Sequence, residues 1–245
     1  MTLSRNGDAQ VRINKYLADS GVASRREADK IIKEGRVKIN GKVVQALSTR
    51  VNTANDTVTL DDNKIKQNVN FIYVMLNKPK GCVVSMRDEK GRKTVMDYIH
   101  ITEKRVFPIG RLDYDSQGLL LFTNDGELAY KLTHPVFEIP KTYIVKIEGT
   151  LNSVELEKLR AGIVLDGEKL NRCKIRPLES SNGLTSYEIT INQGKNRQIK
   201  RMFEAVQKQV VFLKRTSIGE LRLGGLSRGN ARFLNDFEIE YLKKL

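Results

Sequence analysis

The chain has 245 residues, 40% of them apolar and 29% charged, a composition typical of a globular protein rather than a disordered one. No apolar run approaches the roughly 18 residues of a membrane-spanning helix, and the polar residues 1–11, expected to form a loose arm, lack the apolar stretch of a secretory signal. The formal net charge of +14 favours a polyanionic partner, so we expect a cytoplasmic nucleic-acid-binding protein with no membrane contact.

The first quarter of the chain predicts a compact domain of two helices and a few short strands. Ser24 and Glu27 have the spacing of a capping box, in which each side chain satisfies a backbone N–H at a helix start. Asn40-Gly41 between two apolar triplets is a strong short signal for a β-hairpin. We expect this domain to span residues 11–62 and a polar linker to follow at 63–70. The predicted helices and strands cover residues 12–20, 24–34, 37–39, 42–44 and 57–60.

This domain resembles the small RNA-binding domain named after ribosomal protein S-four. The matching segments are residues 12–17, 21–28 and 35–42. The N-terminus of the second helix favours phosphate, and the cations on its outer side suit an RNA backbone. The alternative for a single basic helix is a solvated surface without a ligand. The expected RNA contacts of this domain are Arg12, Lys15, Arg25, Arg26, Lys30 and Lys33.

Residues 71–245 predict a second, larger domain in which strands outnumber helices. Strand-like apolar runs occur at residues 74–76, 82–84, 106–109, 119–122, 143–147, 187–191 and 210–213. Helical patterns occur at residues 126–132, 153–159, 197–205 and 236–242. Because strands and helices do not alternate strictly, we expect an α+β fold with a mixed, mostly antiparallel sheet.

Neither a metal nor a nucleotide cofactor is expected. Cys82 and Cys173, with only two histidines in the chain, form no spacing typical of zinc ligands. Residues 91–94 lack the Gly-Lys pair of a phosphate-binding loop, and residues 219–225 lack the glycine pattern of a dinucleotide-binding turn. The segment that begins at Asp113 imitates a calcium loop, but its twelfth position is Asn where such a loop needs Glu.

One carboxylate, Asp113, has an unusual setting on an expected loop between two apolar strands. Considered alone, an Asp near Gly and Ser usually forms a turn. The surrounding segment, however, resembles the signature of the pseudouridine synthases of the RsuA/RluB group, nearest to their large-subunit branch. The segments that carry the resemblance are residues 107–122, 123–129, 141–143 and 194–204. With the leading domain, the resemblance covers nearly the whole chain.

The resemblance implies a catalytic role for three residues. Asp113 would be the nucleophile, and Lys200 would be the basic partner that keeps it ionised, although relatives often have Arg at that position. Tyr143 would stack on the base and assist proton transfer. The isomerisation needs no redox chemistry, phosphate energy or metal, which agrees with the missing cofactor motifs. Without the resemblance, Tyr143 would be an ordinary strand aromatic and Lys200 part of a basic helix face.

The second domain also has candidate RNA contacts, because residues 195–232 contain ten Lys and Arg against two Glu. The expected contacts in this domain are Arg111, Arg197 and Arg201. We expect a monomer that modifies large-subunit ribosomal RNA. Two alternatives stay open: the same activity on small-subunit ribosomal or transfer RNA, and a non-catalytic RNA-binding factor of ribosome assembly. The sequence does not identify the target uridine.

Overall fold

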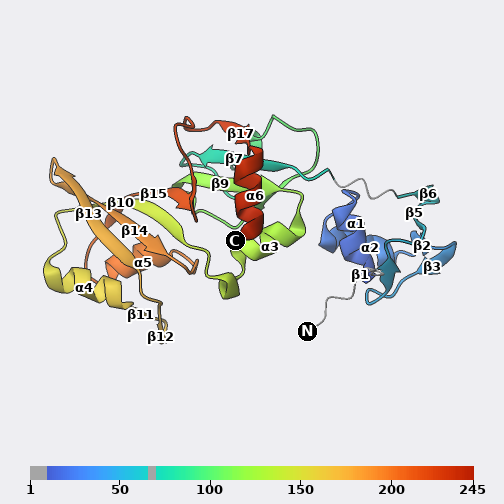
Figure 1. Ribbon diagram of the computed structural model, residues 1–245, viewed down its shortest axis with the longest axis horizontal. Coiled ribbons are helices and arrows are strands. Elements are labelled where there is room, and N and C mark those ends of the chain that lie inside the picture. The colour runs from blue at the N-terminus through green and yellow to red at the C-terminus, as the bar shows by residue number, and fades with distance from the viewer. Residues whose placement is uncertain (1–9, 66–69) are drawn as a thin grey trace. The chain divides into compact units, whose positions relative to one another are not determined.

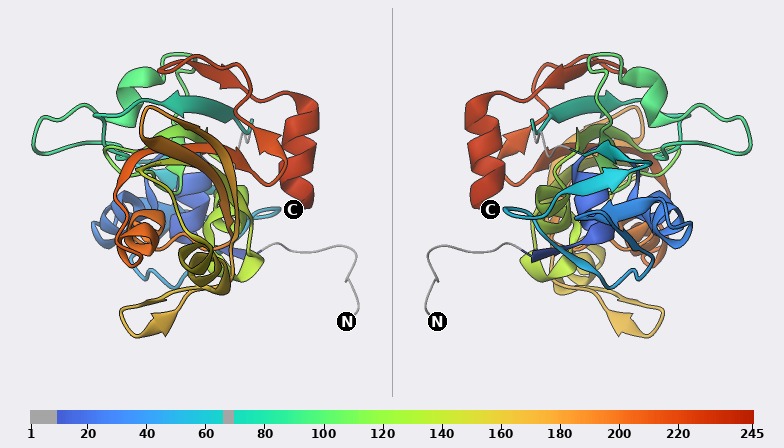
Figure 2. Two further views of the ribbon diagram at one scale, coloured as in Figure 1. Left: turned by 90° about the vertical axis from the view of Figure 1, so that its left-hand side faces the viewer. Right: turned by 90° about the vertical axis from the view of Figure 1, so that its right-hand side faces the viewer.

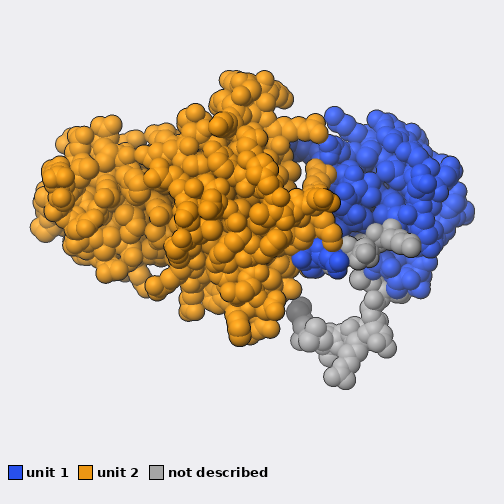
Figure 3. Space-filling model, turned by 90° about the horizontal axis from the view of Figure 1, so that it is seen from above, with its two compact units in different colours: residues 1–71 blue, residues 72–245 orange. Residues whose placement is uncertain are grey.

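The computed structural model describes residues 10–65 and 70–245, and the chain forms two compact units (Figure 1). Figure 3 colours unit 1, Met1–Phe71, and unit 2, Ile72–Leu245. Most of the expected loose arm, and residues 66–69 of the expected linker, lie outside the described residues. Within the described ranges, no helix has both the length and the apolar character needed to cross a membrane.

Unit 1 packs two helices against short strands around one apolar core. Its helices are α1 (Ile13–Asp19) and α2 (Arg25–Lys33), and the predicted capping box at Ser24 and Glu27 is confirmed. Its strands are β1 (Gln10–Arg12), β2 (Val37–Ile39), β3 (Lys42–Val44), β4 (Arg50–Asn52), β5 (Val58–Leu60) and β6 (Asn63–Lys64). They form a sheet of order β3-β2-β5-β6 and a separate β1-β4 pair. The predicted Asn40-Gly41 hairpin joins β2 to β3.

The end of unit 1 differs from the expected linker, which was predicted to begin at residue 63. Asp61 and Asp62 have φ values of 47° and 64°, the left-handed conformation of a tight hairpin turn. This turn leads into β6, which pairs antiparallel with β5, and Ile65 packs against the core of the unit. The two Asp residues therefore continue the sheet instead of ending it.

Unit 2 is built on a mixed sheet of order β13-β14-β10-β15-β9-β7-β17, to which β16 adds on β15 and β8 on β9. Its strands are β7 (Tyr73–Lys78), β8 (Phe107–Ile109), β9 (Gln117–Thr123), β10 (Lys141–Glu148), β13 (Lys174–Ser181), β14 (Leu184–Ile191), β15 (Val210–Ile218), β16 (Leu221–Arg222) and β17 (Ala231–Phe233). A separate hairpin joins β11 (Val164–Leu165) to β12 (Glu168–Lys169). Strands β15 and β9 are parallel, and the other pairs are antiparallel. The expected α+β fold with a mostly antiparallel sheet is confirmed.

Helices cover both faces of this sheet because its central strands are apolar on both sides. Leu119 and Leu121 of β9 pack in one core cluster with residues of α3 (Gly126–Thr133) and α6 (Asp236–Lys244). Leu120 and Phe122 pack in the other cluster, with α4 (Ser153–Ala161) and α5 (Gln198–Glu204). Alternate residues of a strand point to opposite faces, so both faces of β9 are buried. The left view of Figure 2 shows α5 and α6 on opposite sides of the sheet.

The predictions for unit 2 were incomplete, and the short strands β11, β12, β16 and β17 were not expected. The strand expected at residues 82–84 is reduced to a single bridge between Val83 and Thr94, followed by the short 3-10 helix η1 (Val95–Tyr98). Strand β13 was missed because only Ile175 of its eight residues is buried, and its sequence shows no apolar alternation. Strand β13 pairs with β14 through backbone hydrogen bonds, which do not depend on a particular pattern of side chains.

Candidate active site

The loop that holds Asp113 connects β8 to β9, as the sequence predicted. The backbone N–H of Ser116 donates to the carbonyl oxygen of Asp113 at 3.1 Å, which closes a turn. The Asp113 side chain is 33% exposed, so its carboxylate is accessible to a substrate.

Lys78, at the end of β7, holds this loop from inside the protein. Its side chain is fully buried, and its Nζ donates to the carbonyl oxygens of Pro79, Asp113 and Ser116 at 3.1, 3.0 and 2.9 Å. An ammonium has three N–H donors, and these acceptors satisfy all of them. Burial lowers the pKa of Lys78. Lys78 was not predicted, and its only signal was a Lys at the end of an apolar strand.

Lys200 of α5 lies between two carboxylates of the loop. Its Nζ donates to Oδ1 of Asp115 and lies 4.0 Å from Oδ2 of Asp113. The structure contains the predicted ion pair of Lys200 with Asp113, and it adds Asp115, which was not predicted, as the closer partner. Burial raises the pKa of Asp115, but the hydrogen bond and charge of Lys200 outweigh burial, so this pKa lies below its usual value. Lys200 is only 6% exposed, so solvent screens its charge weakly.

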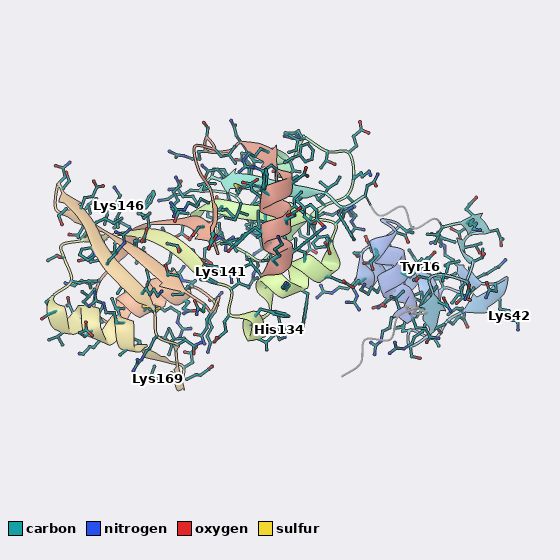
Figure 4. All side chains as sticks on the ribbon, in the orientation of Figure 1. Tyr16, Lys42, His134, Lys141, Lys146 and Lys169 are labelled. Carbon is teal, nitrogen blue, oxygen red and sulfur yellow. The ribbon has the colours of Figure 1, made fainter. Side chains whose placement is uncertain are left out.

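Asp113 and Tyr143 line the same pocket, which lies within unit 2 and has a volume of about 430 Å³. Pockets of this size bind small molecules and cofactors in many proteins. Tyr143 is 7% exposed and belongs to β10. Lys200 does not line the pocket, and it contacts Asp113 from outside the pocket wall. Figure 4 labels two further residues of the wall, Lys141 and His134.

Two cations of the pocket wall, Lys141 and Arg215, were not predicted as site residues. Lys141 and Tyr143 are two residues apart on β10 and so share one face of the strand. Arg215 of β15 is the direct pairing partner of Tyr143. Burial and the charge of Arg215 lower the pKa of Lys141 to about 8. Arg215 belongs to the polar second half of β15 and has no local signal of its own, so only the fold identifies it as a pocket residue.

Exposed cations lie further out on the pocket wall. Arg111 and Arg197, both predicted RNA contacts, line the pocket and are exposed, and Lys195 lines it while half-buried. Lys195 forms an ion pair with Glu168, and the guanidinium of Arg197 lies 3.7 Å from Glu204. Exposed guanidinium groups beside a pocket suit the phosphates of a bound chain.

The structure does not bring Arg201, the third predicted contact of unit 2, to the pocket. Its guanidinium pairs with Asp166 in the β11–β12 hairpin at 2.6 Å, and this pair raises the pKa of Arg201. One residue along a helix turns the side-chain direction by about 100°, so Arg201 faces away from its neighbour Lys200. The prediction of an RNA contact at Arg201 is therefore less well supported than those at Arg111 and Arg197.

The predicted RNA contacts of unit 1 are on its surface. Arg25, Arg26, Lys30 and Lys33 are exposed on α2, and Arg12 is exposed on β1. Lys15 of α1 is half-buried and pairs with Asp19 at 3.0 Å. Their contact with RNA stays a prediction.

The pocket combines an accessible carboxylate, a buried cation behind it and an aromatic ring in its wall. A carboxylate in such a setting can act as a nucleophile, and the ring provides a flat apolar surface for a base. The cations further out match a polyanionic chain that extends beyond the pocket. The arrangement therefore suits covalent chemistry on one nucleotide of a nucleic acid.

Comparison with known proteins agrees with this chemistry. The family model described as RNA pseudouridylate synthase matches residues 72–205, and the S4 domain model matches residues 11–58. The chain is 44% identical over 236 residues to ribosomal large subunit pseudouridine synthase B of Bacillus subtilis strain 168, with 96% of each chain covered. It is 42% identical to an uncharacterized RNA pseudouridine synthase of Aquifex aeolicus strain VF5, covering 96% of this chain and 94% of that one. A crystal structure of a pseudouridylate synthase is 32% identical, with a TM-score of 0.69 over 95% of this chain and 99% of that one.

Proposed function

Because the chain belongs to the family of RNA pseudouridylate synthases, we propose that it converts uridine to pseudouridine in the RNA of the large ribosomal subunit. The support for this substrate is the B. subtilis relative, whose name assigns it to the large subunit. We propose a monomeric enzyme, because one copy of unit 2 contains all three proposed catalytic residues. We also propose that it acts in the cytoplasm and without a cofactor.

The observation that carries the proposal is the position of Asp113. Its carboxylate is accessible in a pocket whose wall includes Tyr143, and Lys200 lies 4.0 Å away on the protein side. Lys78 fixes the backbone of the same residue through its carbonyl oxygen. A reactive group held from two sides and open on the third is the arrangement that nucleophilic catalysis needs.

The chemistry is an isomerisation in which no atoms are gained overall. The bond between C1′ of the ribose and N1 of uracil breaks, the base turns, and C1′ bonds to C5. The proton on C5 is lost, and N1 gains a proton. Ionised Asp113 attacks the ribose or the base, and Tyr143 stacks on the base and moves a proton through its hydroxyl.

The target base has to leave its RNA stack before it enters this pocket. Arg111 and Arg197 hold the phosphates on either side of the flipped nucleotide, because both are exposed on the pocket wall. The exposed cations of α2 in unit 1 hold another part of the RNA. In this proposal, cations of both units bind the RNA.

The substitution Asp113→Asn tests the chemistry, because an amide keeps the shape of the side chain and loses the nucleophilic charge. The measurement is tritium release from large-subunit ribosomal RNA labelled at C5 of uridine. We expect the variant to bind this RNA as well as the wild-type protein does and to release no tritium above background. Turnover by the variant at the wild-type rate would refute the proposed role of Asp113.

The RNA substrate is tested by mapping pseudouridines in cells with and without the gene. A site in large-subunit RNA that disappears with the gene, and returns with the wild-type copy but not with Asp113→Asn, supports the proposal. A lost site in small-subunit or transfer RNA would instead support the alternative substrate.

A further inference from the structure

Two residues of the pocket wall, Arg215 and Ser116, have buried polar atoms without a partner in the part of the chain that the structure describes. Arg215 is 3% exposed, and its Nε donates to the carbonyl oxygen of Leu119 at 2.7 Å, but its Nη2 has no hydrogen-bond partner among the described residues. Ser116 is 1% exposed, and within the same residues its Oγ has no partner either. Buried polar atoms without partners are rare in folded proteins, so two in one pocket wall indicate a ligand.

Lys141 belongs to the same wall and is only partly satisfied. Its Nζ donates to the carbonyl oxygen of Ile139 at 2.9 Å, which accounts for one of three donors. Within residues 10–65 and 70–245, neither Lys141 nor Arg215 forms an ion pair. Two cations next to each other repel, and burial, with this repulsion as the smaller cause, lowers the pKa of Lys141. An electron-rich group between them would relieve the repulsion.

We propose that Lys141, Arg215 and Ser116 bind the hydrogen-bonding edge of the target uracil and stabilise the base as an anion after its bond to ribose breaks. This inference rests on the proposed function and adds a recognition role for residues that it leaves unused. All three line the pocket together with Asp113 and Tyr143.

The three groups match uracil in number and kind. The edge of uracil has two carbonyl oxygens that accept hydrogen bonds and one N–H that donates. Lys141 and Arg215 can only donate, which suits the two carbonyl oxygens, and the Ser116 hydroxyl can accept from the N–H. Cytosine has an amino group in place of one carbonyl, and a cation there would meet a second donor. The wall therefore favours uracil over cytosine.

The chemistry gives the cations a second use. When C1′ separates from N1, the uracil carries negative charge that spreads onto its carbonyl oxygens. Fixed positive groups at those oxygens stabilise this state more than the neutral base, so they lower the barrier and not only the binding constant.

A phosphate group is the alternative ligand for Lys141 and Arg215, but the burial of this part of the pocket wall argues against a phosphate. Arg215 and Ser116 are almost inaccessible, whereas Arg111 and Arg197 on the outer wall are exposed. A flipped base is the part of a nucleotide that reaches furthest into such a pocket, and its phosphates remain near the surface. The buried cations therefore suit the base and the exposed ones the backbone.

The test compares Lys141→Met with Lys141→Arg on a large-subunit RNA fragment from which the wild-type protein releases tritium. We expect Lys141→Met to lower the rate by about 10- to 100-fold, mainly in kcat, and Lys141→Arg to keep most of it. Ser116→Ala removes only the unpartnered hydroxyl, and we expect a fall of about 3- to 10-fold with an unchanged thermal unfolding temperature.

Substituted RNA then distinguishes base from backbone. The target uridine is replaced by 2-thiouridine or 4-thiouridine, whose sulfur accepts hydrogen bonds poorly, or its flanking phosphates are replaced by neutral methylphosphonates. We expect the loss caused by Lys141→Met to shrink on one thio-substituted RNA and to persist on the methylphosphonate RNA. A loss that vanishes only on the methylphosphonate RNA, a loss that is equal on all RNAs, or no loss at all overturns the inference. Failure of the wild-type protein to release tritium from any ribosomal RNA would instead refute the proposed function.

Discussion

Gly118 lies directly against the backbone of Arg215, its partner in the parallel β9–β15 pair. A Cβ atom at Gly118 would come within 2.2 Å of the carbonyl oxygen of Arg215, and the φ of Gly118 is 106°. Only glycine permits this approach, because other residues rarely adopt that φ and their Cβ would collide with the backbone. The contact joins the end of the Asp113 loop to the strand that holds one cation of the pocket.

Gly118→Ala should therefore separate β9 from β15 and disorder the pocket. We expect a loss of several kcal/mol in the free energy of unfolding, together with the loss of activity. The control is Gly91→Ala, where φ is 68° but nothing lies within 4 Å of the added Cβ. The control should cost only the backbone strain, about 1 kcal/mol. Equal losses for both variants in thermal unfolding would show that the contact with Arg215 is not what Gly118 is needed for.

Lys78→Met should damage both stability and catalysis, because three carbonyl oxygens lose the ammonium that donates to them. The Asp113 oxygen keeps the N–H of Ser116 and the Pro79 oxygen keeps the thiol of Cys82, but no other donor to the Ser116 oxygen is found among the described residues. The expected loss is about 2–5 kcal/mol in the free energy of unfolding, measured by urea denaturation. Lys80→Met is the matched control, since Lys80 is exposed and its ammonium lies 5.6 Å from the centre of the Phe212 ring. An unchanged unfolding free energy for Lys78→Met would contradict the role given to Lys78.

The pair of carboxylates around Lys200 makes a graded prediction. Lys200→Met should reduce the rate by at least about 100-fold, because Asp113 and Asp115 then repel each other with no cation between them. Lys200→Arg should keep much of the activity, and Asp115→Asn should be milder than Asp113→Asn because Asp115 does not line the pocket. Single-turnover rates check this order. If Asp115→Asn reduces the rate more than Asp113→Asn does, Asp113 is not the nucleophile.

Lys141 makes a prediction about pH and stability. Its pKa in the folded protein is about 8, below the ordinary value for Lys, so the unfolded chain binds more protons between these two pH values. The stability contributed by this residue therefore rises as the pH increases from about 8 to about 10.4, and the charged form disfavours folding at lower pH. We expect Lys141→Met to be more stable than the wild-type protein at pH 7 and the difference to shrink by pH 10. A difference that is constant with pH would contradict the assignment.

Deletion of residues 1–66 should leave unit 2 folded but weaken its binding to RNA. Each lost phosphate contact should flatten the slope of log affinity against log salt concentration by roughly 0.7 to 0.9. The measurement is a titration of the full-length and shortened proteins with a large-subunit RNA fragment at several salt concentrations. Identical slopes would mean that the exposed cations of α2 do not contact this RNA.

The sequence predicted the parts of the fold that depend on side-chain pattern. The capping box at Ser24, the Asn40-Gly41 hairpin and the apolar strand at residues 119–122 each have a local signature, and each appears in the structure. Strands such as β6 and β13 form through backbone pairing with a neighbouring strand, so their own side-chain pattern does not predict them.

The site was predictable only as far as the family motifs reach. Those motifs named Asp113 and Tyr143, and the structure brings both to one pocket. Lys78 and Arg215 were not predicted because their hydrogen-bond acceptors, the carbonyl oxygens of Asp113 and Leu119, lie in segments that are distant from them in the sequence. For the same reason, the sequence alone does not show whether Lys200 lies closer to Asp115 or to Asp113.

The position of β15 has a consequence for the order in which the molecule folds. This strand, Val210–Ile218, pairs with β10 on one side and with β9 on the other, so it joins two strands that lie much earlier in the chain. Contacts between distant segments form slowly, because the loop between them loses conformational entropy first. A chain emerging from the ribosome therefore lacks a complete pocket until most of its residues have been synthesised, and an unfinished chain is unable to modify RNA.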